Sequence, residues 1–509
     1  MHYGRAGIAL WALACAAAGA AEKERVVGWR GDGTGRYPDA TPPTVWYQKE
    51  SGESSNILWK TKLPCYSWAT PIIVGDKIIT RSEPYDLICL NKHTGKLLWI
   101  RSHPPYIAVT AEEKATNTAF KEIEPLVADL QKVNDAFVAQ GWTKELHKQK
   151  YDLQKKINEL TAAADSKYAL PPDMYVESTS GHTGTTPCSD GQSIFISSGA
   201  GITARYDLDG NLKWLRYESV RSWGEHGGPQ CSPTLVGDKL LVAVTRLRAL
   251  NKASGEELWQ QSVGSGYSLP TFNAGGTDFV FSGGNYVRVS DGKVVVPRGS
   301  NWPGGTMAVI NDNTFYFVGH LCFWRWEAKP DGGLSVTPLI DGEYHNATVP
   351  YGQNPAFKFK LDDTLTGFYT ASPLYHEGLL YCVANAGRLV VADTKVTKKD
   401  EVVVYSSFPP FDFKNGFGRK TYGMGLGASP ALAGKYIYMI DSANCTIVME
   451  PGREYKQVAK NNIDYTVPEG WEPRHWVGPH HEQTEASLVF DGNRIYIRGE
   501  QFLYCVGEK

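Results

Sequence analysis

The sequence has almost no surplus of charge, because 52 Lys and Arg residues oppose 54 Asp and Glu residues and leave a formal net charge of -2. A chain that binds nucleic acid through its phosphates needs a basic stripe, so the charge balance disfavours that class of function. The nine cysteines include no Cys-x-x-Cys motif, no Cys-x-x-Cys-His motif and no adjacent pair. These absences exclude c-type haem attachment and the common zinc ribbons.

Long apolar runs are also absent after the first residues, since no later run reaches the roughly 18 residues that span a bilayer. The first residues have the order of an export signal: Arg5 supplies charge, residues 6–17 an apolar core, and Ala18-Gly19-Ala20 a cleavage site. We predict a signal peptide at residues 1–21 and a periplasmic or extracellular protein. A rival interpretation places a lipid, and hence a membrane attachment, on Cys15, although the usual Leu three residues before it is missing.

Eight cysteines follow the predicted signal peptide. An even number in an oxidising compartment permits disulfides. Most of these cysteines lie inside apolar runs, as Cys89, Cys382 and Cys505 do, where cysteine serves as a small buried hydrophobe. Both interpretations stay open at this point.

A short phrase recurs along the chain: Ala-Thr/Ser-Pro, an apolar run, a turn such as Gly-Asp, and a second apolar run. Three copies continue into a strand followed by a turn whose glycine precedes a tryptophan by four residues, at Trp99, Trp214 and Trp259. The Gly-Asp pair is a two-residue hairpin signal. Repeats of four short strands indicate a radial or linear repeat architecture.

The repeats predict an all-β fold, one eight-bladed β-propeller over residues 56–509, with an N-terminal arm at 22–55 lying across one face. The last repeat supplies three strands, and residues 56–63 read as its missing fourth strand. Pairing these first and last strands would close the ring and leave no full-length edge exposed. The eight repeat starts are Pro71, Pro187, Pro233, Pro270, Met307, Pro373, Pro430 and Ala486.

Residues 111–165 interrupt the repeats with a stretch that is poor in glycine and rich in Lys, Glu, Ala and Gln. Its apolar residues recur at three- and four-residue spacings, which predicts an inserted α-helical hairpin. Gly141 to Thr143 break the run, and Thr143 suits a helix start. A charged hairpin of this kind is usually a solvated ornament, and the rival interpretation is a docking element for a protein partner.

The repeats resemble the pyrroloquinoline-quinone-like propeller superfamily, and most of all an exported bacterial group that opens with Trp-Arg-Gly-x-x-Gly-x-Gly. Here the corresponding segment is Trp29-Arg30-Gly31-Asp32-Gly33-Thr34-Gly35, which has one residue fewer between its first two glycines, and the closing tail Leu503–Lys509 also fits the group. The resemblance covers residues 29–509 without the helical insertion. It implies a propeller fold. For function it implies two alternatives. One is quinone-dependent oxidation of alcohols or sugars, and the other is non-catalytic scaffolding as in a propeller lipoprotein of outer-membrane protein assembly.

Residues just before each inner strand should converge on one mouth of the propeller channel and form a candidate binding cup. The cluster His480-His481-Glu482 could hold a divalent metal or work as acid and base, whereas the alternative is that such residues only hydrogen-bond loop backbone. Arg419 would supply a permanent positive charge for a carboxylate or sulfated sugar. The candidate ligand-binding residues are His182, Trp223, His226, Gln230, Tyr267, Trp302, Tyr369, Arg419, Tyr422, His480, His481 and Glu482.

The sequence thus supports two functions. The first is an exported binding or scaffold propeller that recognises a peptide, glycan or small molecule at the channel mouth. The second is a quinone- or metal-dependent oxidoreductase acting on sugars or alcohols. The adjacent cysteine pair common in quinone dehydrogenases is missing, and no local motif assigns calcium ligands. Pyrroloquinoline quinone with calcium therefore stays an open cofactor, and no catalytic or metal-binding residue is assigned.

Overall fold

A computed structural model of the chain describes most of the sequence outside the predicted signal peptide. Every structural statement below concerns these residues. No helix among them combines the length and the apolar character needed to cross a membrane. The described residues are 26–170, 182–220, 231–264, 266, 268–297, 308–311, 313–317, 322–340, 371–384, 387–397, 401–412, 427–464 and 484–508.

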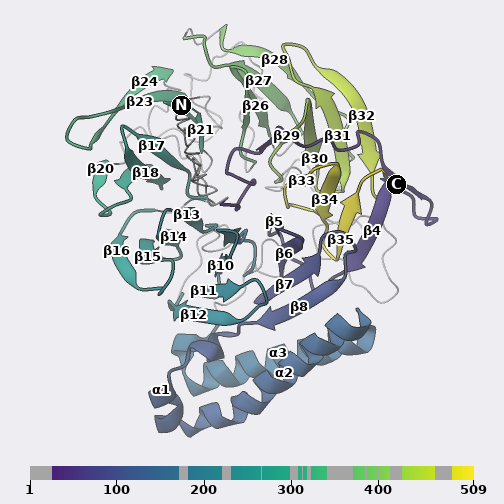
Figure 1. The fold of residues 1–509 in the computed structure, drawn as a ribbon, viewed down its shortest axis with the longest axis vertical. Coiled ribbons are helices and arrows are strands. Elements are labelled where there is room, and N and C mark those ends of the chain that lie inside the picture. The colour runs from purple at the N-terminus through teal and green to yellow at the C-terminus, as the bar shows by residue number, and fades with distance from the viewer. Residues whose placement is uncertain are drawn as a thin grey trace, which may run out of the picture.

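Four-stranded antiparallel sheets surround a common centre, with the first strand of each repeat innermost (Figure 1). Seven of the sheets in the described residues are continuous blades, each built from four successive strands. Their strands are β5 (Ile72–Val74), β6 (Lys77–Ser82), β7 (Asp86–Asn91), β8 (Leu97–Ser102); β9 (Cys188–Ser189), β10 (Ser193–Ser197), β11 (Ile202–Asp207), β12 (Leu212–Tyr217); β13 (Thr234–Val236), β14 (Lys239–Ala243), β15 (Leu247–Asn251), β16 (Glu257–Gln261); β17 (Thr271–Ala274), β18 (Thr277–Ser282), β19 (Asn285–Arg288), β20 (Val294–Val296); β21 (Ala308–Asn311), β22 (Thr314–Phe317), β23 (Cys322–Ala328), β24 (Leu334–Ile340); β25 (Leu374–His376), β26 (Leu379–Val383), β27 (Leu389–Asp393), β28 (Val403–Ser407); and β29 (Ala431–Ala433), β30 (Tyr436–Ile440), β31 (Cys445–Glu450), β32 (Lys456–Asn462).

A further four-stranded sheet is a composite of the two ends of the chain. It combines β33 (Val489–Asp491), β34 (Arg494–Arg498) and β35 (Phe502–Val506) with β4 (Ile57–Lys62). β35 and β4 pair antiparallel, with Tyr504 opposite Lys60 and Cys505 opposite Trp59. The predicted pairing of the last strand with the first is confirmed, and it joins the ends of the ring.

The predicted fold class of eight blades needs correction. The repeats give seven continuous blades rather than eight, because the last repeat has only three strands and its sheet is completed by β4. The predicted helical insertion is confirmed, and it is larger than a hairpin and has a hydrophobic core of its own. Its elements are η1 (Pro105–Ala108), α1 (Ala111–Thr116), η2 (Thr118–Glu122), α2 (Ile123–Gln140), α3 (Lys144–Ala164) and η3 (Ser166–Tyr168).

The insertion covers the outer edge of the first continuous blade, where α2 lies along β8 and α3 packs against α2 (Figure 1). α3 begins where the sequence predicts, because the Thr143 hydroxyl accepts a hydrogen bond from the Leu146 N–H at 3.1 Å. The helices are fixed by a buried ion pair between Lys150 Nζ and Asp86 Oδ2 at 2.9 Å. Covering an edge strand removes a row of unpaired backbone groups.

The tryptophans of the repeat dock neighbouring blades onto one another. The indole of Trp99 donates to the Leu208 carbonyl in the next blade at 3.1 Å and packs on Gly210. A Cβ at Gly210 would lie 2.8 Å from the ring, and the residue has φ of +79°. Trp214 and Trp259 make the same contacts with the blades that follow them. The motif is therefore a structural device between blades.

The Ser or Thr before each inner strand forms a second set of links between blades, on the inside of the ring. Its hydroxyl accepts a hydrogen bond from the N–H of the equivalent residue in the preceding blade, at 2.9–3.1 Å, in the pairs Thr186 to Ser232, Ser372 to Ser429, Ser429 to Ser487 and Ser487 to Thr70. These buried bonds give a physical reason for the recurring Ala-Thr/Ser-Pro phrase.

The N-terminal arm lies inside the ring rather than across one face (Figure 1). Val27 pairs antiparallel with Ser189 at the end of β9. β1 (Arg36–Tyr37) then adds to β29 as a parallel strand on its inner side. The hairpin of β2 (Tyr47–Gln48) and β3 (Ser54–Ser55) leads on to β4.

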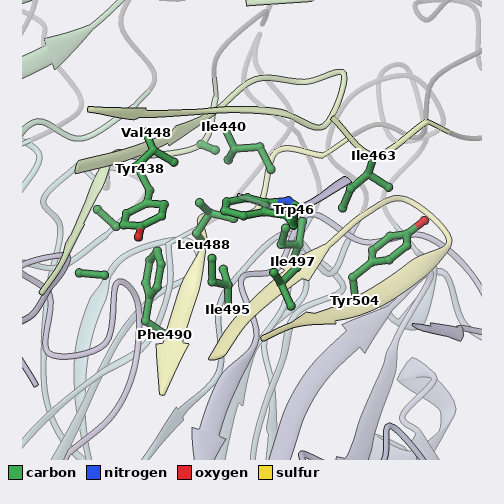
Figure 2. Packing of buried hydrophobic residues seen from close by; sticks show 14 of the residues in the cluster. Trp46, Tyr438, Ile440, Val448, Ile463, Leu488, Phe490, Ile495, Ile497 and Tyr504 are labelled. Carbon is green, nitrogen blue, oxygen red and sulfur yellow. The ribbon is translucent and has the colours of Figure 1, made fainter. Parts of the chain in front are cut away.

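A hydrophobic cluster anchors the arm where it leaves the channel. Figure 2 shows the Trp46 ring between Ile440 of β30 and Ile497 of β34, so the arm wedges a continuous blade against the closing sheet. Trp46 is 1% exposed, and its N–H donates to the Asn461 side-chain oxygen at 2.9 Å. In the same blades the thiols of Cys445 and Cys505 are buried and form no disulfide. For these residues the interpretation of cysteine as a buried hydrophobe is confirmed.

Candidate functional site

The structure describes one of the twelve predicted site residues, His182. It precedes β9 and is 5% exposed. The convergence of the other predicted residues with His182 therefore remains a prediction. Those that lie outside the described residues are Trp223, His226, Gln230, Tyr267, Trp302, Tyr369, Arg419, Tyr422, His480, His481 and Glu482.

The segment that carries His182 is held by the carboxylate of Glu83, in the connection between β6 and β7. The two carboxylate oxygens accept hydrogen bonds from the His182 N–H at 2.8 Å and the Thr183 N–H at 2.7 Å. The Thr183 hydroxyl donates to the same carboxylate. The imidazole Nδ1 of His182 lies 3.6 Å from Glu83 Oε2. Amides aimed at a buried carboxylate make charge-assisted bonds, so this segment is rigidly positioned.

Ser67 joins this cluster from the loop that precedes β5. Its hydroxyl donates to the Thr183 carbonyl at 3.1 Å, and its oxygen lies 3.0 Å from the Thr183 hydroxyl oxygen. The sequence predicts that Ser67 and Thr183 lie at the same mouth of the channel, because each precedes an inner strand. The structure brings these two segments together.

A second polar group lies beside the first and was missed by the sequence analysis. The guanidinium of Arg81, fully buried in β6, donates at 2.6 Å both to the Thr185 hydroxyl and to the Ser197 carbonyl of the next blade. Its other terminal nitrogen lies 3.3 Å from His103 Nε2. Burial lowers the pKa of Arg81 to about 10. The guanidinium still carries its charge at neutral pH.

His103 faces that charge in a dry environment. Burial first, and the positive charge of Arg81 second, hold the pKa of His103 well below its usual range. The imidazole is therefore neutral and accepts the hydrogen bond from Arg81. The aromatic rings of Tyr85 and Tyr206 lie 6.5 and 6.4 Å from the imidazole, centroid to centroid. A signal for this cluster does exist in the sequence, since Arg81 to Glu83 interrupt an apolar strand with three polar residues.

The described side chains around His182 hold backbone segments and neighbouring blades together. The Glu83 carboxylate accepts hydrogen bonds from two backbone amides and one hydroxyl, which fix the segment that carries His182. No group of three His, Cys, Asp or Glu side chains in the described part of the chain could hold a metal ion. The described residues therefore do not provide the calcium site that a quinone cofactor would need.

The propeller architecture and its docking tryptophans agree with the sequence comparisons. Residues 175–318 match a family described as outer membrane protein assembly factor BamB, built on PQQ-like repeats. Over these residues the propeller is similar to that family. The matched residues include three of the continuous blades, β9–β12, β13–β16 and β17–β20, and the two tryptophans that dock them onto one another, Trp214 and Trp259.

Solved structures similar to this propeller share little sequence with it. BamB from Moraxella catarrhalis is 11% identical, covers 89% of this chain and 97% of its own, and gives a TM-score of 0.46. A computationally designed protein, Ika8, is 9% identical, with coverage of 89% and 100% and a TM-score of 0.44. U3-55K is 11% identical, with coverage of 62% and 92% and a TM-score of 0.36. A search of curated proteins finds no significant match.

Proposed function

We propose that this PQQ-like propeller is an exported binding or scaffold protein that recognises a peptide, glycan or small molecule at the channel mouth near His182. The proposal rests on the hydrogen bonds of the described residues around His182. Glu83 accepts hydrogen bonds that hold a loop segment in place, and Arg81 donates hydrogen bonds that join neighbouring blades. A rigid rim that presents loops is the usual arrangement of a recognition surface.

The match to the BamB family supports a scaffold more than an enzyme. The quinone-dependent alternative gains no support from the described residues, because they lack a metal-binding group of acidic or imidazole side chains. It depends on the loops around Arg419 and His480 to Glu482. Uptake of pyrroloquinoline quinone with calcium, followed by dye reduction with sugars and alcohols, discriminates between the two functions.

Export is part of the proposal and rests on the order of charge and apolar residues at positions 1–21. Mass spectrometry of the N-terminus of the protein recovered from a bacterial host gives the processed end. Cleavage after Ala20 or Ala21 agrees with a released protein. A diacylated Cys15 would instead show membrane attachment, and an intact Met1 would contradict export.

The binding proposal is tested with the variant Tyr267→Ala/Trp302→Ala, which removes two aromatic surfaces from the predicted cup. We expect this variant to lose at least about tenfold in affinity for any ligand found in a peptide and glycan array, since buried aromatic contacts carry much of the energy at such sites. Tyr151→Ala, an exposed aromatic of α3, is the matched control and should bind normally. Equal binding by both variants would show that the cup has been assigned to the wrong face.

A further inference from the structure

The sequence motif that begins at Trp29 contains an arginine, Arg30, that the proposed function above does not involve. Arg30 is 2% exposed, and its two terminal nitrogens donate to carbonyls of two different blades. Nη1 donates to the Pro373 carbonyl at 2.9 Å, and Nη2 donates to the Pro430 carbonyl at 3.0 Å. Both prolines belong to the recurring phrase just before an inner strand. Two adjacent repeats thus form a socket of carbonyl oxygens for one guanidinium.

The backbone around this arginine is shaped for the socket. Arg30 itself has φ of +56°, a conformation that costs energy for a residue with a side chain. Gly35 has φ of +71°, and a Cβ there would lie 2.4 Å from Arg30 Nη2. A glycine is therefore required for the guanidinium to pass the backbone. Strain of this kind persists where the surrounding structure holds the residue in place.

Next to the socket, the inner edge of β29 pairs with the arm as a neighbouring strand. The Leu432 N–H donates to the Gly35 carbonyl at 2.9 Å, and the Gly434 N–H donates to the Tyr37 carbonyl at 3.0 Å. The Tyr37 ring packs 5.2 Å from Phe490, centroid to centroid. The inner edge of β29 thus binds the backbone of an extended segment, and the side chains of Arg30 and Tyr37 add further contacts. This combination is how strand addition recognises a peptide.

We propose that the inner edge of β29, together with the Pro373 and Pro430 carbonyls, is a binding site for an extended, arginine-containing peptide. Its resident ligand is residues 28–37 of the same chain. The site lies inside the ring and is distinct from the predicted cup of mouth loops, so its existence does not depend on the outcome of the binding tests above.

The test uses the full chain, cut after it has folded. A specific protease site replaces residues 50–52, which form the exposed turn between β2 and β3. Cleavage there breaks the covalent link between the arm and the propeller, and the arm stays bound through its non-covalent contacts alone. A fluorescent synthetic peptide of residues 26–50 is then added, and its incorporation is followed by anisotropy and size-exclusion chromatography.

We expect the wild-type peptide to replace the resident arm. A peptide with Arg30→Ala should bind at least about tenfold more weakly, since it loses two charge-assisted hydrogen bonds in a buried socket. A peptide with Arg36→Ala is the matched control and should bind like wild type, because Arg36 pairs with Leu432 through its backbone. The proposal is overturned if the cut protein takes up no peptide, or if the Arg30→Ala peptide enters as well as wild type.

A second measurement needs no cleavage. In the intact chain, Arg30→Ala should speed amide hydrogen exchange at Leu432 and Gly434, the two N–H groups bonded to the arm. The amide of Met439 in β30 is the control, because Met439 pairs with Ile447 of β31 and has no partner on β29. Unchanged protection of Leu432 and Gly434 would show that the guanidinium does not hold the strand.

Discussion

At the scale of single residues, the rim is organised by buried charges that are satisfied inside the protein. Glu83 binds two amides of the segment that carries His182, and Arg81 joins the same blade to the next. Removing one partner of such a contact leaves a buried polar group without a bond, which is costly. These residues therefore fix the segments that they join.

His103 gives this cluster a measurable pH dependence. Because its pKa is lowered in the folded state, the unfolded chain binds a proton below about pH 6.5 that the folded chain does not. The free energy of unfolding should therefore fall as the pH drops below that value, by at most about 1.4 kcal/mol per pH unit from this group. Urea unfolding between pH 7.5 and 5 measures it.

The variant His103→Gln isolates the contribution of the imidazole. It lacks the titrating group, so its stability should decline less steeply over the same pH interval, whatever its stability at pH 7.5. Parallel pH profiles for the variant and the wild type would show that His103 is not the group responsible.

At the scale of elements, the contacts between blades explain which sequence signals were informative. The Ala-Thr/Ser-Pro phrase and the tryptophans recur because each makes the same bond to the next blade, so the strands they flank were predictable. The helices of the insertion were predictable from their apolar spacing, and Thr143 begins α3 as expected. The docking of Lys150 onto Asp86 left no local signal, because the pair joins distant segments.

Gly210 offers a direct test of the tryptophan contact. In Gly210→Ala the new methyl group would meet the Trp99 ring and force it to move, in addition to the strain of a positive φ. Gly237 also has a positive φ but nothing within 4 Å of its Cβ position. We expect Gly237→Ala to cost about 1 kcal/mol and Gly210→Ala clearly more, by chemical denaturation. Equal costs would contradict packing of Trp99 on this turn.

At the scale of the whole molecule, the sequence predicted a closed ring of repeated strands but not how the chain occupies its centre. Pairing of β4 with β35 followed from counting strands. The number of continuous blades was overestimated by one, because the three-stranded last repeat was counted as a blade together with residues 56–63. The path of the arm could not be predicted, since the strand β1 is two residues long and pairs with a segment nearly 400 residues away.

In the candidate site, too, contacts that follow from the repeat pattern were predictable and contacts between unrelated positions were not. The meeting of Ser67 with Thr183 followed from their equivalent places before inner strands. Glu83 and Arg81 were missed because their partners lie in another blade. What the propeller adds is proximity between loops from distant repeats, and the predicted binding cup depends on that proximity.

The most direct test of the account is an experimental structure in which the distances from Arg419 to His182 and to His480 are measured. The account places all three at one mouth of the channel, where one ligand can contact them. We expect Arg419 to lie within about 15 Å of at least one of the two histidines, the span of one small ligand and its contacts. Distances greater than this to both histidines would contradict the shared site.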